Sequence, residues 1–200
     1  MPRFEILPRR LPREIADPAG RAVARAGVTP NMVSLLGFAG NLAAAWLVTR
    51  DELLWAGIVY GVFSALDLVD GAVARATGRA TPFGAVLDAV LDRASEMVVL
   101  AAMAWYFGAR GEMVQAGVAY AALFGSVAVS YIRARAEMAG VAMREGLFRR
   151  QERVVVLTVG LLLNGLTVVA WVLAVLTNLT ALQRSWLLAK ALRAEDQRPS

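Results

Sequence analysis

The chain alternates long apolar segments with short polar segments that are rich in arginine. Apolar residues nearly free of charge fill 32–48, 54–66, 98–107, 116–132 and 154–182. A helix that crosses the hydrocarbon core of a bilayer needs about 20 apolar residues, and fewer where its polar ends pack against protein. The pattern therefore predicts six spanning helices, at roughly 31–49, 53–72, 83–107, 115–136, 152–164 and 166–188.

The boundary between the last two predicted helices depends on one turn signal. Asn164-Gly165 is a turn dipeptide inside an apolar run that is too long for one untilted crossing. A single long tilted helix is the alternative at this place.

The positions of the basic residues predict the orientation in the membrane. Nearly all of the 21 Lys and Arg residues fall in 1–30, 73–82, 133–153 and the segment that begins at Arg184. The turns of the opposite side hold Arg50 and Arg110. Because cytoplasmic loops carry the excess of positive charge, we expect a multi-pass protein of the cell membrane with an even number of spans and both termini in the cytoplasm.

The chain is expected to have three parts: a cytoplasmic juxtamembrane segment over 1–30, a six-helix transmembrane catalytic domain over 31–188 and a cytoplasmic tail over 189–200. Residues 9–26 mix apolar side chains with arginines in the pattern of an amphipathic helix that lies among lipid headgroups. A short soluble cap packed on the helices is the alternative. From Leu192 onward the composition is typical of a frayed end.

Composition narrows the chemistry. A content of 58% hydrophobic and 18% charged residues, with a mean hydropathy of +0.54, argues against a soluble enzyme, a disordered chain and a secreted disulfide scaffold. Cysteine and histidine are absent, so carboxylates, arginines, hydroxyls and the backbone must supply any chemistry. The net charge of +5 does not indicate a nucleic-acid partner, because the arginines gather in loops beside the predicted membrane.

Four aspartates mark the predicted functional region. Asp67 and Asp70 lie three residues apart at the end of the second predicted helix, and Asp88 and Asp92 lie four apart at the start of the third, so each pair shares a helix face. Ionisable groups at membrane depth are costly and usually mark function. Clustered carboxylates repel one another, and Mg²⁺ or Mn²⁺ would neutralise them. With one carboxylate bridging, such a group can hold two ions about 3.5–4 Å apart, which clamps a phosphoryl group.

Small residues and one arginine accompany the aspartates. Gly71, Ala74 and Gly84 leave room for a substrate, and Arg75 is placed to pair with a phosphate. Tight helix packing through small residues is the alternative for each glycine.

Together these residues form a motif with fixed spacing, Asp67-x2-Asp70-Gly71-x2-Ala74-Arg75-x8-Gly84-x3-Asp88-x3-Asp92. It resembles the signature of the CDP-alcohol phosphotransferases, and the likeness extends from about Asp17 to Arg184. The resemblance implies an all-α integral membrane fold of six transmembrane helices that forms a homodimer. It also implies an enzyme that cleaves the pyrophosphate of a CDP-linked lipid, releases CMP and joins the phosphatidyl group to an alcohol.

The resemblance also implies roles for residues at matching positions. Asp67, Asp70 and Asp88 would bind two Mg²⁺ ions, or Mn²⁺, and Asp92 would complete this set and take the proton from the acceptor hydroxyl. The CDP-lipid would be bound by Pro30, Asn31, Met32, Val33, Gly71, Ala74, Arg75 and Thr81. The segment that begins at Thr29 resembles the T-P-N segment of the family, with ordinary helix N-terminal chemistry as the alternative.

The cations of the later loops suggest a phosphorylated acceptor. Arg133, Arg153 and Arg184 each stand at the cytoplasmic end of a predicted helix, where they can converge on one anion. Anchoring of the topology is the alternative for each of them. The S-Y-x-[KR]-A-R-A-E segment from Ser130, the later E-R pair and the Gln183-Arg184 pair resemble the branch that makes phosphatidylinositol phosphate from CDP-diacylglycerol and inositol 1-phosphate. In that branch cations at these three positions hold the inositol phosphate.

Other acceptors and donors are possible within the same fold: glycerol 3-phosphate, serine, an archaeal-type lipid donor or a CDP-inositol donor. The glycerol phosphate branch typically has Pro and Lys where this chain has Ala89 and Arg93. A transporter of divalent cations that uses the four aspartates is the alternative from another class. The cytoplasmic bias of the charges argues against it.

Glu96 extends the stripe of Gly84, Asp88 and Asp92 by one further turn into the membrane. We expect it to orient Arg93 or another polar partner, with a merely buried carboxyl as the alternative.

Overall fold

The protein is described by a computed structural model that covers residues 27–77, 81–143 and 146–196, with the side chains of 67–77, 195 and 196 outside the description. Most of the juxtamembrane segment predicted over 1–30 lies outside the described residues. The last residues of the predicted tail, 197–200, lie outside them as well.

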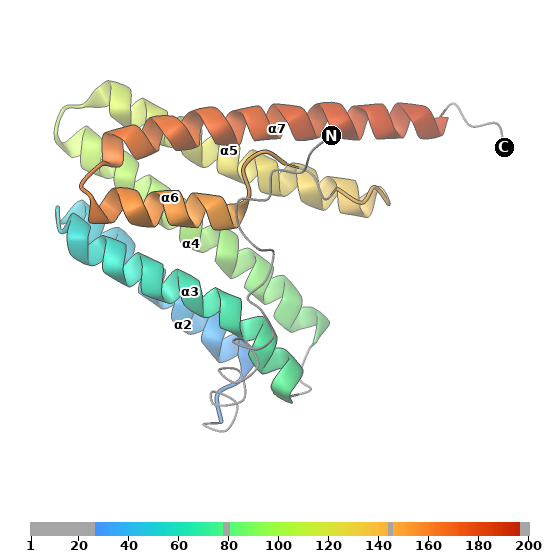
Figure 1. The fold of residues 1–200 in the computed structure, drawn as a ribbon, viewed down its shortest axis with the longest axis horizontal. Coiled ribbons are helices and arrows are strands. Elements are labelled where there is room, and N and C mark those ends of the chain that lie inside the picture. Colours follow the sequence, from blue (N-terminus) through green and yellow to red (C-terminus); the bar gives the residue numbers. More distant parts are fainter. Residues whose placement is uncertain (1–26, 78–80, 144–145, 197–200) are drawn as a thin grey trace.

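The described residues form six α-helices and no strand (Figure 1). They are α2 (Pro30–Thr49), α3 (Leu53–Thr77), α4 (Pro82–Ala109), α5 (Met113–Met138), α6 (Arg150–Leu162) and α7 (Leu166–Asp196). Each corresponds to one helix predicted from the sequence. The break between α6 and α7 confirms the split at Asn164, which has a positive φ of 55°, a conformation that asparagine tolerates better than most residues.

The end of α7 differs from the sequence prediction. A frayed tail was expected beyond Leu192, but the helix continues to Asp196. Ala189, Ala191 and Ala194 are strong helix formers, and no proline interrupts the chain before Pro199. Intrinsic helix propensity therefore carries α7 past the length that an apolar span requires.

Local capping chemistry fixes where α2 and α4 begin. Thr29 and Thr81 each precede a proline and accept a hydrogen bond from a backbone N–H three residues later, Met32 N at 3.3 Å and Gly84 N at 3.0 Å. Proline suits the first helical position because its missing N–H needs no partner there.

The helices diverge from one end of the molecule, where the short turns lie (Figure 1). At that end Asp51 pairs with Arg110 at 2.6 Å, which joins the α2–α3 turn to the α4–α5 turn. Helix α2 packs on α3 and α4, α4 packs on α5, and α5 packs on α7, while α6 packs on both α3 and α7. The buried core follows these contacts and includes Tyr60, Met103 and Leu173.

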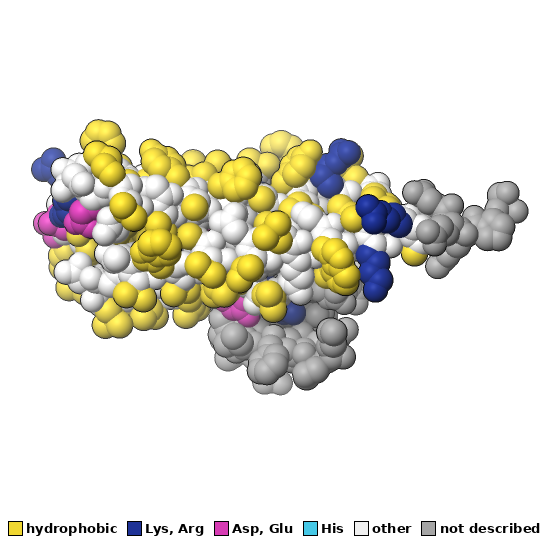
Figure 2. Space-filling model, turned by 90° about the horizontal axis from the view of Figure 1, so that it is seen from above, with side chains coloured by type: hydrophobic (Ala, Val, Ile, Leu, Met, Phe, Trp, Pro, Cys, Tyr) yellow, Lys and Arg dark blue, Asp and Glu magenta, His cyan; other side chains and the backbone are white. Residues whose placement is uncertain are grey.

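Large apolar side chains remain exposed around the helices. They include all five tryptophans of the chain, Trp46, Trp55, Trp105, Trp171 and Trp186. Apolar side chains cover the middle of the face drawn in Figure 2, and most charged side chains lie toward its ends. Three described helices, Pro30–Thr49, Met113–Met138 and Leu166–Ala194, are long and apolar enough to cross a membrane. These properties are those of a membrane protein. That all six helices cross the membrane stays a prediction.

Close packing of α5 on α7 depends on Gly125. A Cβ atom there would lie 2.2 Å from Thr177 Oγ1 and 2.9 Å from the Asn178 backbone nitrogen. Asn178 Nδ2 also donates to Ala121 O across this contact, at 2.9 Å. Small residues allow helices in a membrane to approach closely enough for such hydrogen bonds.

We predict that Gly125→Ala destabilises the protein by about 1–3 kcal/mol, because α5 and α7 must separate to admit the methyl group. Thermal unfolding of the purified protein in detergent measures the loss. Gly117→Ala on the same helix is the matched control, since nothing lies within 4 Å of a Cβ atom at that position. Equal melting temperatures for the two variants would contradict the claim that the packing of α5 on α7 depends on Gly125.

Candidate functional site: an arginine-lined cavity beside Asp92

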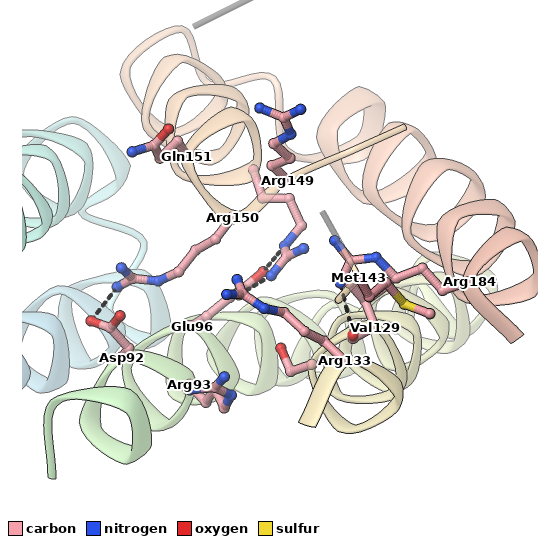
Figure 3. A pocket seen from close by; sticks show the side chains of 12 residues that line it. Asp92, Arg93, Glu96, Val129, Arg133, Met143, Arg149, Arg150, Gln151 and Arg184 are labelled. Atoms are coloured by element: carbon pink, nitrogen blue, oxygen red, sulfur yellow. Dashed lines mark hydrogen bonds and ion pairs between the residues drawn. The ribbon is translucent and has the colours of Figure 1, made fainter. Parts of the chain in front are cut away.

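A cavity of about 550 Å³ opens between α4, α5, α7 and the start of α6 (Figure 3). Its lining residues are Asp92, Arg93, Glu96, Val129, Ser130, Arg133, Met143, Arg149, Arg150, Gln151, Arg153 and Arg184. Six of them are arginines and two are carboxylates, so the lining carries an excess of positive charge. Such a lining suits an anion, and above all a phosphate, which arginine binds with two parallel hydrogen bonds.

One carboxylate of the cavity, Asp92, is held by an arginine from α6. Arg150 Nη2 lies 2.9 Å from Asp92 Oδ1, and both side chains are partly accessible to solvent. Figure 3 shows Arg150 extending from the first turn of α6 toward α4. The contact places the carboxylate of Asp92 at the edge of the cavity.

The second carboxylate, Glu96, lies one turn further along α4 and pairs with Arg153. Arg153 Nε and Nη2 donate to the two carboxylate oxygens of Glu96 at 2.5 and 2.8 Å. Both side chains are only 4% exposed. The partner of Glu96 is therefore Arg153 rather than Arg93, whose guanidinium donates to Ala89 O.

Arg184 is fixed from two sides. Its Nη1 donates to Val129 O on α5 at 3.0 Å. A Cβ atom on Gly146 would lie 2.6 Å from Arg184 Nη2, so only glycine lets the backbone approach this guanidinium so closely. Next to it, Gln183 Oε1 accepts a hydrogen bond from Leu147 N at 3.2 Å.

Arg133 occupies the outer edge of the cavity. Its Nε donates to Glu137 Oε1 at 2.9 Å on the surface of α5, with both side chains more than half exposed. A pair this exposed contributes little to stability and is easily exchanged for another anion.

The structure thus brings together four of the residues named from the sequence, since Asp92, Arg133, Arg153 and Arg184 all line one cavity. Sequence reasoning missed Arg149 and Arg150, which it assigned only to the basic loop. A signal was available, because Arg150 precedes Arg153 by one helical turn and therefore shares its face.

A second group of the named residues surrounds the first turns of α2 and α4. Ser34 Oγ donates to Asp88 Oδ1 at 3.2 Å, across these two helices. A Cβ atom on Gly84 would lie 2.9 Å from Asn31 Oδ1 and 3.1 Å from Thr81 Oγ1. Of the neighbouring named residues on α2, Met32 is exposed and Val33 is buried, while Pro30 begins the helix.

The remaining named residues, Asp67, Asp70, Gly71, Ala74 and Arg75, lie on the last turns of α3, and their side chains are outside the described residues. Among the side chains that are described, no group of three or more carboxylates gathers closely enough to hold a metal ion. Convergence of the two aspartate pairs stays a prediction.

Comparison with known proteins identifies the family. Residues 27–188 match the family model described as CDP-alcohol phosphatidyltransferase. The chain belongs to the CDP-alcohol phosphatidyltransferase family. The prediction of this family, and of an enzyme that transfers a phosphatidyl-type group, is confirmed.

Relatives of the chain within the CDP-alcohol phosphatidyltransferase family share most of its length. The phosphatidylinositol phosphate synthase of Mycobacteroides abscessus is 36% identical over 189 residues, covering 90% of this chain and 86% of the relative. The archaetidylinositol phosphate synthase of Pyrococcus horikoshii is also 36% identical, over 167 residues, covering 82% of this chain and 86% of that protein.

Solved structures of one family member have the same fold. The phosphatidylinositol phosphate synthase of Mycobacterium tuberculosis with CDP-DAG bound gives a TM-score of 0.80 at 32% identity, covering 88% of this chain and 94% of that one. The same enzyme in complex with manganese and citrate gives a TM-score of 0.77 at 32% identity, covering 87% and 88%.

Proposed function

We propose that this phosphatidyltransferase moves the phosphatidyl group of CDP-diacylglycerol to a hydroxyl of inositol 1-phosphate, giving phosphatidylinositol phosphate and CMP. The observation that carries the proposal is the placement of Asp92, a proton acceptor, in the same cavity as six arginines. A carboxylate and a phosphate-binding lining in one cavity suit an acceptor that carries both a hydroxyl and a phosphate.

The relatives support this acceptor. The two named above differ in the lipid that their names specify, phosphatidyl against archaetidyl, yet both names specify inositol phosphate. The acceptor is therefore the feature that these relatives have in common, and the lipid of the donor is the feature that varies.

In the proposed reaction, the acceptor oxygen forms a bond with the β-phosphorus of the CDP-lipid. The bond from that phosphorus to the oxygen of CMP breaks, and CMP leaves with the bonding electrons. Asp92 accepts the proton of the acceptor hydroxyl. Arg133, Arg153 and Arg184 bind the acceptor phosphate, and the fixed positions of Arg153 and Arg184 orient the hydroxyl toward the donor.

Divalent cations are proposed as cofactors, with two Mg²⁺ ions favoured and Mn²⁺ as the alternative. The described donors fit, because Asp88 and Asp92 offer carboxylate oxygens from one face of α4, the ligand type that both ions prefer. Asp67 and Asp70 are proposed to complete the set. When bound, the ions neutralise the pyrophosphate and stabilise the departing CMP. A solved relative is in complex with manganese.

The nucleotide end of the CDP-lipid is proposed to lie where α2 and α4 begin. Asn31 Oδ1 and Thr81 Oγ1 already approach Gly84 more closely than a side chain at that position would allow. Met32, Val33 and Pro30 would line the same place from α2. Gly71, Ala74 and Arg75 are proposed to complete it from α3.

We further propose a multi-pass protein of the cell membrane that forms a homodimer, with both termini and the active site on the cytoplasmic side. Five of the six arginines of the cavity, all except Arg93, belong to segments that the charge distribution assigns to the cytoplasm.

Release of CMP from CDP-diacylglycerol with Mg²⁺ tests the proposal. Inositol 1-phosphate, free inositol, glycerol 3-phosphate and serine are offered side by side to the purified protein. We expect release with inositol 1-phosphate alone. Release with another acceptor alone would refute the assigned acceptor, and the same panel with an archaeal-type CDP-lipid shows which donor the enzyme prefers.

Asp92→Asn is expected to abolish turnover while leaving CDP-diacylglycerol binding nearly unchanged, because the amide keeps the size of the side chain but accepts no proton. Turnover is followed by CMP release, and donor binding by equilibrium titration. Substantial turnover in this variant would exclude Asp92 as the base, and loss of donor binding would make it chiefly a ligand.

Arg184→Ala should raise the KM for inositol 1-phosphate by roughly 10- to 100-fold, since it removes a charge-assisted contact to the phosphate. The KM for the CDP-lipid should stay nearly constant. Arg193→Ala is the matched control, because Arg193 is exposed on the same helix and does not line the cavity. Equal acceptor KM values in the two variants would remove Arg184 from the site.

A further inference from the structure

The buried pair of Glu96 and Arg153 lies directly behind the partly exposed pair of Asp92 and Arg150. Glu96 follows Asp92 by one turn of α4, and Arg153 follows Arg150 by one turn of α6. The side chains of Asp92 and Arg150 are partly accessible to solvent, whereas those of Glu96 and Arg153 are each 4% exposed.

Stability alone is a weak reason for an ion pair at this depth. Removing two charges from water costs several kcal/mol for each ion, and apolar residues of similar volume often serve as well or better. One turn further along α4 and α6, the hydrophobic core holds the apolar side chains of Val99 and Leu157, so apolar groups are accommodated next to the pair. The pair therefore calls for a function that apolar packing cannot supply.

The geometry of the guanidinium indicates that function. Arginine has five N–H donors in one rigid plane. Glu96 occupies the edge formed by Nε and Nη2 of Arg153, and Phe148 O accepts from Nη1 at 3.4 Å. These contacts use three of the five N–H groups. The two that remain, one on Nη1 and one on Nη2, lie at the end of the guanidinium, and Arg153 is a lining residue of the cavity. This end is the edge that can bind a phosphate with two parallel hydrogen bonds.

We propose that Glu96 is a positioning residue for the acceptor: its carboxylate holds one edge of Arg153 so that the other edge is fixed for the acceptor phosphate. This inference rests on the proposed function of the cavity. Because the guanidinium is planar and rigid, fixing one edge at two points fixes the direction of the opposite donors before the ligand arrives. The entropic cost of ordering the Arg153 side chain is then not added to the binding of the acceptor.

A carboxylate suits this task better than an amide. Both of its oxygens accept, so it matches the two donors of Arg153. Glutamine would present one oxygen and one NH₂ group, and the NH₂ group would face an arginine donor. It would also leave the charge of Arg153 uncompensated in a buried place.

The experiment compares steady-state constants for wild type, Glu96→Gln, Arg153→Ala and the double variant, with CDP-diacylglycerol and inositol 1-phosphate as substrates. Glu96→Gln is expected to raise the KM for inositol 1-phosphate roughly 10-fold, with kcat and the KM for CDP-diacylglycerol nearly constant. In the Arg153→Ala background, Glu96→Gln should add little, because a residue that acts only through Arg153 has no effect once Arg153 is gone.

Asp51→Asn provides the matched control. It breaks the ion pair with Arg110 at the opposite end of the helices and should leave the acceptor KM unchanged. If Glu96→Gln does not yield folded protein, Glu96→Asp is measured instead, since the shorter carboxylate keeps the charge but cannot span both donors; an intermediate rise in acceptor KM is expected.

Three results overturn the inference: an unchanged acceptor KM in Glu96→Gln, an equal rise in the KM of both substrates, or full additivity with Arg153→Ala. The wild-type enzyme keeps these distinct from a failure of the proposed function. If wild type turns over inositol 1-phosphate and Glu96→Gln behaves like it, only the positioning role fails. If wild type does not use inositol 1-phosphate at all, the proposed function fails first.

Discussion

A charged side chain buried among apolar helices needs a partner of opposite charge, and the arrangement of the site depends on this requirement. Helix α4 carries Asp92 and Glu96 one turn apart, and α6 carries Arg150 and Arg153 one turn apart, so two ion pairs connect the helices in register. A shift of either helix along its axis would break both pairs at once. The pairs therefore fix the position of α6 relative to α4, and with it the floor of the cavity.

The other walls of the cavity are fixed in part by contacts between side chains and the backbone. Arg184 from α7 donates to Val129 O on α5, and Gly146 leaves room for its guanidinium. The start of α6 is fixed by Glu152, whose Oε2 accepts from Arg149 N at 2.7 Å. Six arginines and two carboxylates line the cavity, so the lining has the positive charge that a phosphorylated acceptor requires.

Sequence patterns predicted the helices well, and physical chemistry explains both the success and the limits. Apolar run length and the turn signal at Asn164 are local properties, so the helices and the break before α7 could be predicted. The partner of Glu96 could not be predicted, because Arg153 lies 57 residues further along the chain. Arg149 and Arg150 were missed because the basic loop was interpreted only as a topology signal, although the spacing of Arg150 and Arg153 places both on one helix face. The extension of α7 to Asp196 follows helix propensity, which an argument from membrane thickness does not include.

The central claim is that the cavity recognises the phosphate of the acceptor, and equilibrium binding tests it most directly. Inositol 1-phosphate and free inositol are titrated separately into the purified protein in detergent with Mg²⁺ and without CDP-lipid, at low and high salt. Binding of the phosphate ester should be at least roughly 10-fold tighter than binding of inositol and should weaken as salt is added, because charge-assisted contacts supply the difference. Equal affinity for the two ligands, or an affinity for the ester that salt leaves unchanged, would contradict the account.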